Sequence, residues 1–413
     1  MSARRWRVAS PGQAKVRLKR MKRTTKKRVV ITFPQHPAFV KRMVEGILDY
    51  ARDAGRWSVV WMPEFQAASL DWLEHWPGDG AFVYIASEAD ARLARSLKIP
   101  VVNFAALVRA PGLPTVMVDH RAVGCLAAEH LLARHFRLFG FYGSLGKPFS
   151  QLRREGFCET IQQAGGECRV LEVPRETDAR GRWTNQQQAL ERWVRSLPRP
   201  VGIMACNDPR AGMVLNACLA VGLRVPEQAA IIGADNDPVI CTDAAVPLSS
   251  VARQDREVGC QAAQLLDRLM SGSVPPSSPI LVPPEGVVQR RSTESYAVAD
   301  PQVQAALAYL SEHLGEPFGV ERLLTAAGLS RRPFEVRFQR LLGKPPYEFI
   351  LAQRVARARQ MLAEPGGHNF TTIATACGFT ELRHLRAVFQ RVAGQSPAEY
   401  RRKIVEAMLT HSR

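Results

Sequence analysis

From residue 28 onward, short apolar runs alternate with longer stretches whose apolar residues recur at helical spacing. The first run, Val29 to Phe33, is followed by four apolar residues on one helical face: Phe39, Met43, Ile47 and Tyr50. Further apolar runs occur at 57–62, 81–85, 100–104, 138–142, 201–205 and 230–233. This alternation is typical of parallel βαβ units. We therefore predict a two-lobed α/β body with parallel sheets, divided near residues 119–134, and a cleft between the lobes.

The pattern changes twice near the end of this body. A segment rich in Ser and Pro spans 271–284, and the apolar runs 280–282 and 287–288 close the α/β part. Beyond Pro301 only helical periodicity remains. The expected organisation is a disordered basic arm at 1–28, a ligand-binding and dimerisation body at 29–295, a linker at 296–300 and an all-α domain at 301–413.

The helical domain contains an internal repeat, which is the strongest signal in the chain. The segment from Phe338 to Phe349 matches the segment from Phe389 to Tyr400 at Phe, Gln, Arg, Gly, Pro, Glu and the final aromatic residue. Each copy follows a short helix and a turn with glycine, Gly328 in the first and Gly378 in the second. A helix, a short turn and a second helix opened by a Ser or Thr cap predict a helix-turn-helix motif. Two copies predict a domain with two DNA-reading helices.

Helical phase predicts which side chains face DNA. In the first reading helix Phe334, Phe338 and Leu341 share the inner face, and in the second Leu385, Val388 and Phe389 do. The remaining positions can meet base edges or phosphates: Arg331, Arg332, Glu335, Val336, Gln339 and Lys344 in the first repeat, and Arg383, His384, Arg386 and Ala387 in the second. Arg can fork onto guanine, a carboxylate can accept from cytosine, and Val can touch a thymine methyl group.

This domain resembles the DNA-binding domain of the arabinose-regulator (AraC/XylS) family. The matching positions include the turn from Gly328 to Ser330, the helical motif Arg354, Ala358 and Leu362, the segment 373–379, and the segment 396–401. The resemblance implies a transcription regulator, with double-stranded DNA and RNA polymerase as partners.

Charge is distributed in agreement with DNA binding at the chain ends. Residues 1–28 hold 12 Lys or Arg and no acid, and residues 301–413 hold 16 against 9 acids, a net of +7. The middle keeps 56 − 12 − 16 = 28 bases against 38 − 9 = 29 acids, a net of −1. Two basic ends on a near-neutral body favour a polyanionic partner.

The α/β body resembles the ligand-binding core of lactose/galactose-repressor-type regulators and periplasmic sugar-binding proteins. Four segments carry the resemblance: 116–124, 153–157, 206–208 and 232–236. The run from Ile280, with 290–293, resembles regulators of xylose operons, which join this core to an arabinose-regulator domain. The resemblance implies a homodimer that activates a pentose catabolic operon.

Several side chains near predicted strand ends suit a polyol ligand, because open α/β sheets bind ligands at that edge. Carboxylates accept from vicinal hydroxyls, Arg and Asn donate, and aromatic rings stack on the C–H face of a sugar. The candidates are Asp119, Asp208, Asp235, Arg153, Asn207, Asn236, Phe39, Phe149 and Trp183. An Asp after a strand is about as often a helix cap, so the alternative role stays open for each aspartate.

The sequence gives little support for an enzyme, a metalloprotein or a membrane protein. The stretch 140–147 fails the spacing of a phosphate-binding loop, and neither G-x-S-x-G nor H-E-x-x-H occurs. Eight cysteines without metal-ligand spacing predict reduced thiols, no metal and no cofactor. No apolar run reaches membrane-spanning length, so we expect a cytoplasmic protein. The prediction is a sugar-responsive regulator that is not an enzyme; a ligand-independent DNA binder that dimerises through its body, and a sugar-processing enzyme with a regulatory tail, are the alternatives.

Overall fold

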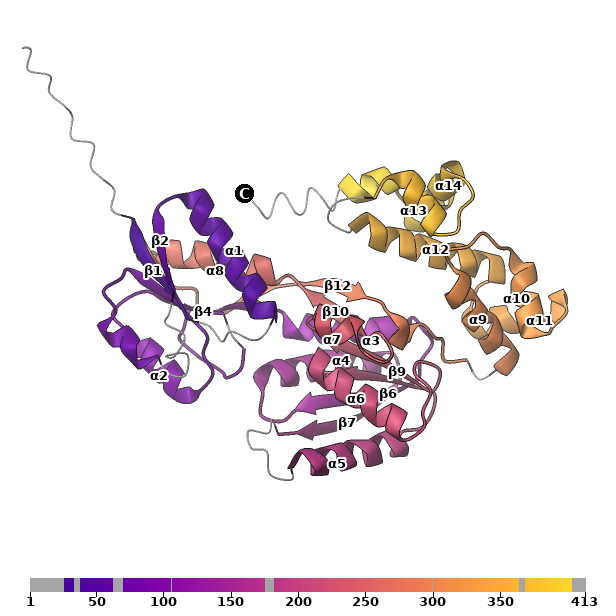
Figure 1. Cartoon of the computed structure of the whole chain (residues 1–413), viewed down its shortest axis with the longest axis horizontal. Coiled ribbons are helices and arrows are strands. Elements are labelled where there is room, and N and C mark those ends of the chain that lie inside the picture. The colour runs from indigo at the N-terminus through magenta and orange to yellow at the C-terminus, as the bar shows by residue number, and fades with distance from the viewer. Residues whose placement is uncertain are drawn as a thin grey trace, which may run out of the picture.

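The computed structural model shows two α/β lobes followed by a helical domain (Figure 1). It describes residues 26–32, 38–61, 70–104, 106–174, 182–298, 300–363 and 368–402. The α/β body and the all-α domain agree with the predicted fold class. Lys27 and Arg28, which we assigned to the basic arm, instead open the first strand, and the rest of that arm except Lys26 lies outside the described residues.

The first lobe contains a parallel sheet in the order β2-β1-β3-β4. Its strands are β1 (Lys27–Ile31), β2 (Trp57–Trp61), β3 (Gly80–Val83) and β4 (Val101–Asn103). Helical elements are α1 (Ala38–Ala54), η2 (Asp71–His75) and α2 (Glu88–Ser96). A separate parallel pair joins β5 (Val116–Val118) to β11 (Ile280–Val282).

The second lobe contains a six-stranded sheet in the order β12-β10-β9-β8-β6-β7. Its strands are β6 (Leu138–Ser144), β7 (Glu167–Val173), β8 (Val201–Ala205), β9 (Ala229–Ala234), β10 (Ser249–Arg253) and β12 (Pro284–Val288). Only β12 runs antiparallel to its neighbour. The helical elements are α3 (His120–Leu132), α4 (Pro148–Gln163), α5 (Arg182–Ser196), α6 (Asp208–Ala220), α7 (Pro238–Thr242) and η3 (Arg291–Thr293).

The chain crosses between the lobes three times, whereas the sequence suggested one division. The first crossing, between β5 and α3, falls at the expected place. A second follows β10, because α8 (Asp255–Met270) returns to pack on α1, and a third lies between β11 and β12. The return of α8 covers the apolar face of α1, which would otherwise remain in water.

Glycines let two helix pairs approach closely, one pair in each lobe. A Cβ on Gly46 of α1 would lie 1.9 Å from the carbonyl oxygen of Arg256 in α8. In the second lobe, a Cβ on Gly124 of α3 would lie 2.1 Å from the carbonyl oxygen of Arg153 in α4. Both distances are impossible for a real side chain, so each pair depends on glycine for its spacing.

The helical domain has two small apolar cores that share one long helix. The helices are α9 (Pro301–His313), α10 (Val320–Ala327), α11 (Arg331–Leu342), α12 (Pro346–Ala363), α13 (Phe370–Ala376) and α14 (Leu382–Ala393). Phe349 and Ile350 of α12 join the first core, and Leu351 and Val355 join the second. Figure 1 shows α10 and α11 on one side of α12 and α13 and α14 on the other. No helix in the described ranges is long and apolar enough to cross a membrane.

Candidate ligand pocket and DNA-reading surface

A pocket of about 570 Å³ lies between the two lobes, a volume in the range of small-molecule sites. From the first lobe it is lined by α1 and by residues that follow β3 and β4. From the second lobe it is lined by residues at the carboxyl ends of β6, β8, β9 and β10. This is the edge at which open α/β sheets bind ligands.

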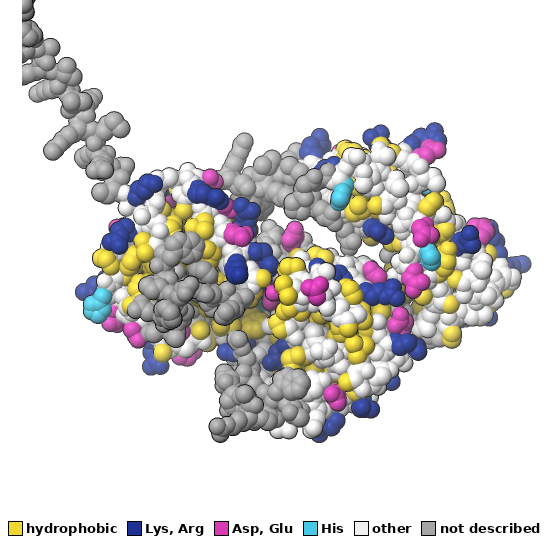
Figure 2. Space-filling model, viewed as in Figure 1, with side chains coloured by type: hydrophobic (Ala, Val, Ile, Leu, Met, Phe, Trp, Pro, Cys, Tyr) yellow, Lys and Arg dark blue, Asp and Glu magenta, His cyan; other side chains and the backbone are white. Residues whose placement is uncertain are grey.

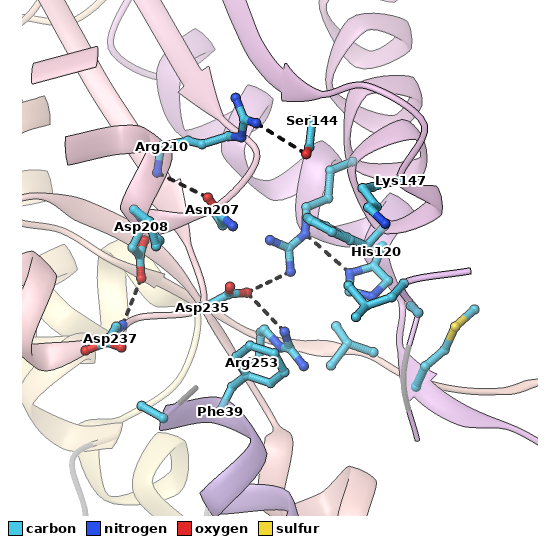
Figure 3. A pocket seen from close by; sticks show the side chains of 18 of the residues that line it. Phe39, His120, Ser144, Lys147, Asn207, Asp208, Arg210, Asp235, Asp237 and Arg253 are labelled. Atoms are coloured by element: carbon cyan, nitrogen blue, oxygen red, sulfur yellow. Dashed lines mark hydrogen bonds and ion pairs between the residues drawn. The ribbon is translucent and has the colours of Figure 1, made fainter. Parts of the chain in front are cut away.

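Asp235 is the central carboxylate of this pocket (Figure 3). Its Oδ1 accepts from Arg153 Nη2 at 2.8 Å and from Arg253 Nη1 at 3.1 Å. Burial raises the pKa of Asp235, but the two guanidinium groups more than offset this, so its pKa is lowered overall. Asp235 is therefore an ionised acceptor held between two donors.

The backbone at Asp235 and Asn236 adopts a conformation that side chains rarely allow, with φ of 108° and 48° respectively. Three successive amides are nevertheless satisfied. Asp235 N donates to the carbonyl of Val251, and Asn236 N to Ser250 Oγ at 3.0 Å. Asp237 N donates to Asp208 Oδ2 at 2.8 Å. These bonds stabilise the strained turn that presents the Asp235 carboxylate to the pocket.

His120 orients Arg153 from the side opposite Asp235. The Nε of Arg153 lies 3.3 Å from Nδ1 of His120, which accepts the bond. Burial, followed by the charges of Arg153 and Arg253, lowers the pKa of His120 well below its ordinary value. A neutral ring can accept from a guanidinium, so His120 and Asp235 together fix the Arg153 side chain.

Two contacts bridge the lobes across the pocket. Arg42 of α1 donates from Nη2 to the carbonyl of Asp235 at 2.8 Å and pairs with Asp255 at 2.8 Å. The Arg253 guanidinium lies 4.5 Å from the ring centroid of Phe39, also on α1. The relative position of the lobes is thus coupled to side chains that line the pocket.

The structure places the predicted ligand residues in different roles. Six of them line the pocket: Phe39, Phe149, Arg153, Asn207, Asp208 and Asp235. Asp119 is instead the N-cap of α3, where its carboxylate accepts from the amide of Ala122, and it is not among the lining residues. Asn236 is absent from the lining as well, because its side chain accepts from Arg290. The side chain of Trp183 lies outside the described part of the structure.

The side chains of two lining residues also make hydrogen bonds within the protein. Asn207 caps α6 by accepting from the amide of Arg210 at 3.2 Å. Asp208 is fully buried and accepts from Ser250 Oγ at 2.6 Å. Burial, with the charge of Asp235, raises the pKa of Asp208 to about 7.

Several other polar, aromatic and basic side chains, which the sequence did not indicate, line the pocket, and half of them are Lys or Arg. They are Arg42, Tyr84, Phe104, His120, Ser144, Lys147, Arg210 and Arg253. The position of Arg253 at the carboxyl end of a strand could have revealed it, but β10 itself went unrecognised. Arg42 gives no such signal, because a basic residue on a helix is usually solvated.

The predicted reading face of α11 is largely exposed. Arg332, Gln339 and Lys344 are exposed, Val336 is 63% exposed, and Glu335 is half-buried. Phe334 and Phe338 are buried as expected, with Leu342 rather than Leu341 as the third inner residue. Arg331 is also exposed, and its guanidinium pairs with Glu321 of α10 at 2.5 Å on the surface of the helix-turn-helix unit.

The second reading helix follows the same plan. Leu385, Val388 and Phe389 are buried, whereas Arg383, Arg386 and Ala387 are exposed. His384 is half-buried and packs edge-on against Phe379. The caps differ from expectation: Ser330 makes no side-chain capping bond, and Glu381, not Thr380, precedes α14. Figure 2 shows Lys and Arg side chains along the outer edge of the helical domain on its visible face.

The segment that joins the body to the helical domain is packed on both. Ala297 N donates to the carbonyl of Arg134 in the body. The Tyr296 ring lies 5.2 Å from that of Phe349 in the helical domain, and Val298 is buried in the first helical core. The connection is therefore a structured contact between the pocket-bearing body and the first helix-turn-helix unit.

Known proteins share both parts of this architecture. Residues 128–293 match the family model of a periplasmic binding protein-like domain, and residues 323–403 match that of a helix-turn-helix domain. The chain is 30% identical over 397 residues to the xylose operon regulatory protein of Escherichia coli K12, covering 94% of this chain and all of the relative. The corresponding protein of Haemophilus influenzae is 28% identical, with 91% and 98% covered. A solved structure of a xylose-binding transcription activator superposes with a TM-score of 0.59 at 28% identity, covering 91% of this chain and 98% of the other.

A ligand-binding body joined to two helix-turn-helix units defines a DNA-binding transcription regulator that responds to a sugar. The chain belongs to the family of xylose operon regulatory proteins. The relatives are regulators, which confirms the expectation that the chain is not an enzyme. Among the described residues, no cluster of three His, Cys, Asp or Glu side chains is placed to hold a metal ion.

Proposed function

We propose that this regulator activates a pentose catabolic operon in the cytoplasm, as a homodimer that recruits RNA polymerase. The single observation that carries the effector part is Asp235, an ionised acceptor fixed by two guanidinium groups in a pocket of about 570 Å³. The relatives' names favour xylose or a related pentose. With the first strand included, the proposed division is a body at 27–295, a linker at 296–300 and a DNA-binding domain at 301–413.

The ligand set is formed by the six predicted lining residues together with Arg42, His120 and Arg253. Asp235 and Asp208 accept from sugar hydroxyls, while Arg153 and Asn207 donate to them. Phe39 and Phe149 cover the C–H faces. Because Arg42 and Phe39 belong to the first lobe, ligand contact with both lobes favours one relative position of the lobes over others.

The reading residues are those exposed on α11 and α14, with Lys344 on phosphate. Arg332, Arg383 and Arg386 are the candidates for guanine contacts, and Val336 for a thymine methyl group. Glu335, Gln339, His384 and Ala387 flank them, and Arg331, which is exposed and pairs with Glu321, is a further candidate for DNA contact. Each helix would occupy its own major-groove segment.

The test of the effector is titration calorimetry of the full chain against pentoses, hexoses and their derivatives. At least one sugar should bind, and Asp235→Ala should weaken it by about 1.5 to 3 kcal/mol, since a charged hydrogen-bond partner is lost. Asp243→Ala, an exposed carboxylate next to α7, serves as the matched control and should leave the affinity unchanged. Failure of every sugar to bind would favour the alternative in which the body only dimerises.

A further inference from the structure

The two helix-turn-helix units touch each other directly, in addition to sharing α12. The loop between α9 and α10, residues 314–318, lies against the turn of the second unit. Gly378 in that turn has a φ of 75°, and a Cβ there would lie 2.7 Å from the carbonyl oxygen of Glu316. A Cβ on Gly315 would lie 2.9 Å from the carbonyl oxygen of Ala376. Both distances are too short for a real side chain, so the backbones of the loop and the turn are in close contact.

Arg354 of α12 lies beside this contact and is only 5% exposed. Its Nη2 donates to the carbonyl oxygens of Glu316 at 2.7 Å and of Phe318 at 3.3 Å. Its guanidinium lies 5.0 Å from the ring centroid of Phe318 and 5.9 Å from that of Phe379. Phe318 packs on the apolar core of the first unit, and Phe379 belongs to that of the second. A single buried guanidinium therefore contacts both units.

The two units would otherwise be connected through α12 alone. The first unit packs on Phe349 and Ile350 of this helix, and the second packs on Leu351 and Val355. A helix can bend, so one such connection leaves the two units some freedom to change their relative angle. The contact at Arg354 adds a second connection beside the helix. With two connections, α11 and α14 keep a fixed distance and orientation.

We propose that Arg354 is a positioning residue that fixes the spacing of the two reading helices, so that each chain accepts only one spacing between the two DNA segments it reads. This inference rests on the proposed reading of DNA by α11 and α14. Arg354 acts from inside the domain and does not itself read a base. One inserted base pair moves the second segment by about 3.4 Å and rotates it by roughly 35°, which a fixed pair of helices cannot follow.

The chemistry of arginine suits this role better than that of lysine or methionine. A planar guanidinium donates several hydrogen bonds in its plane and offers its two faces to aromatic rings. Methionine at position 354 would fill much of the same space, but it would donate no bond to the loop. Arg354→Met therefore removes the connection between the units while it keeps an apolar side chain in the buried position.

Binding to DNA of altered spacing tests this role. Sites selected from random DNA by the full wild-type chain define the two segments, and fluorescence anisotropy then compares the selected site with one that carries a single inserted base pair between them. The quantity measured is the ratio of the two affinities for each protein. We expect the insertion to weaken the wild type at least tenfold and Arg354→Met less than threefold. A loss of stability alone would lower both affinities and leave the ratio unchanged.

Arg359→Met is the matched control. Arg359 also belongs to α12, and its guanidinium lies 5.9 Å from the ring centroid of Phe389 and 5.7 Å from that of Tyr400. Both rings pack in the second unit, so Arg359 makes these contacts within that unit. Its substitution should preserve the tenfold effect of the insertion.

If Arg354→Met does not fold, Phe318→Leu decides, because it removes one of the two rings and should reduce the wild-type ratio at least twofold. The role of Arg354 is refuted if the variant that folds keeps the wild-type ratio, or if the wild type itself tolerates the insertion; reading by α11 and α14 survives either result. Selected sites without two conserved segments about one DNA turn apart would overturn the reading helices and the role of Arg354 together.

Discussion

Arg290 donates from Nη2 to Oδ1 of Asn236 at 2.8 Å, which ties the turn that carries Asp235 to the segment that leads into the DNA-binding domain. Arg290 is further fixed by bonds between its backbone and Ser249 Oγ. The next residue, Arg291, lies 3.6 Å from Glu312 of α9. A contiguous set of contacts therefore connects the pocket to the first helix of the DNA-binding domain.

Removal of the hydrogen bond between Arg290 and Asn236 should weaken the coupling between sugar binding in the body and DNA binding in the helical domain. We expect Arg290→Met to reduce the effect of the sugar on DNA affinity at least fivefold, within the range of about 1 to 3 kcal/mol typical of coupling energies. Sugar affinity itself should change less than threefold, because Arg290 is not a lining residue. Binding titrations with both ligands measure this, with Arg268→Met, exposed on α8, as the control. Full retention of coupling would exclude Arg290 from the connection.

The close pairing of α3 and α4 should be sensitive to a single methyl group. Gly124→Ala places a Cβ against the carbonyl of Arg153, so α4 must shift. We expect the free energy of unfolding to fall by roughly 1 to 3 kcal/mol, with a loss of sugar affinity through displacement of Arg153. Gly212→Ala on α6 meets no atom within 4 Å and should cost nothing. Equal stability of the two variants in urea titrations would show that α4 can move freely.

Asp208 should make stability depend on pH in a defined direction. Its pKa is raised from 3.8 to about 7, so between these values the unfolded state alone is ionised. A rise in pH from 4.5 to 7.5 should therefore destabilise the wild type relative to Asp208→Asn by about 3 kcal/mol. Denaturant titrations of both proteins across this range measure the difference. A difference that does not vary with pH would mean that Asp208 ionises normally.

In the DNA-binding domain, substitutions of base-reading residues should change the sequence preference, whereas substitution of a phosphate-binding residue should change the overall affinity for DNA. Arg332→Ala or Arg383→Ala should relax preference at one or two base pairs, at about 1 to 3 kcal/mol each, and the two positions should lie about one DNA turn apart. Lys344→Ala should instead weaken all sequences alike. Selection of sites from random DNA compares the wild type with the three variants. A uniform loss of affinity in the Arg variants would show that other residues read the bases.

The strands that the sequence did not reveal are those whose burial depends on polar contacts or that lie at an edge. Strand β10 contains Ser249, Ser250 and Arg253, all buried through hydrogen bonds or ion pairs rather than apolar packing. Edge strand β7 is half exposed along much of its length. Hydrophobic periodicity detects neither case, whereas the fully apolar strands β8 and β11 were predicted at their observed limits.

The pocket residues, like the strands, could be predicted from the sequence only in part. Asp119 and Asp235 both follow a strand, and only the structure distinguishes the helix cap from the pocket carboxylate. The difference arises from the turn: Asp119 is followed directly by α3, whereas Asp235 is held at a positive φ that turns it toward Arg153. Basic pocket residues such as Arg42 depend on which helix faces the cleft, and tertiary packing alone decides that.

The central claim is that a sugar in the pocket between the lobes controls DNA binding. The most direct measurement is the fluorescence anisotropy of a labelled selected site titrated with the full chain, in the presence and absence of the tightest-binding sugar from calorimetry. We predict that the sugar changes the DNA affinity of the wild type at least fivefold and that Asp235→Ala abolishes the change while still binding the site. An identical DNA affinity with and without saturating sugar would contradict the account.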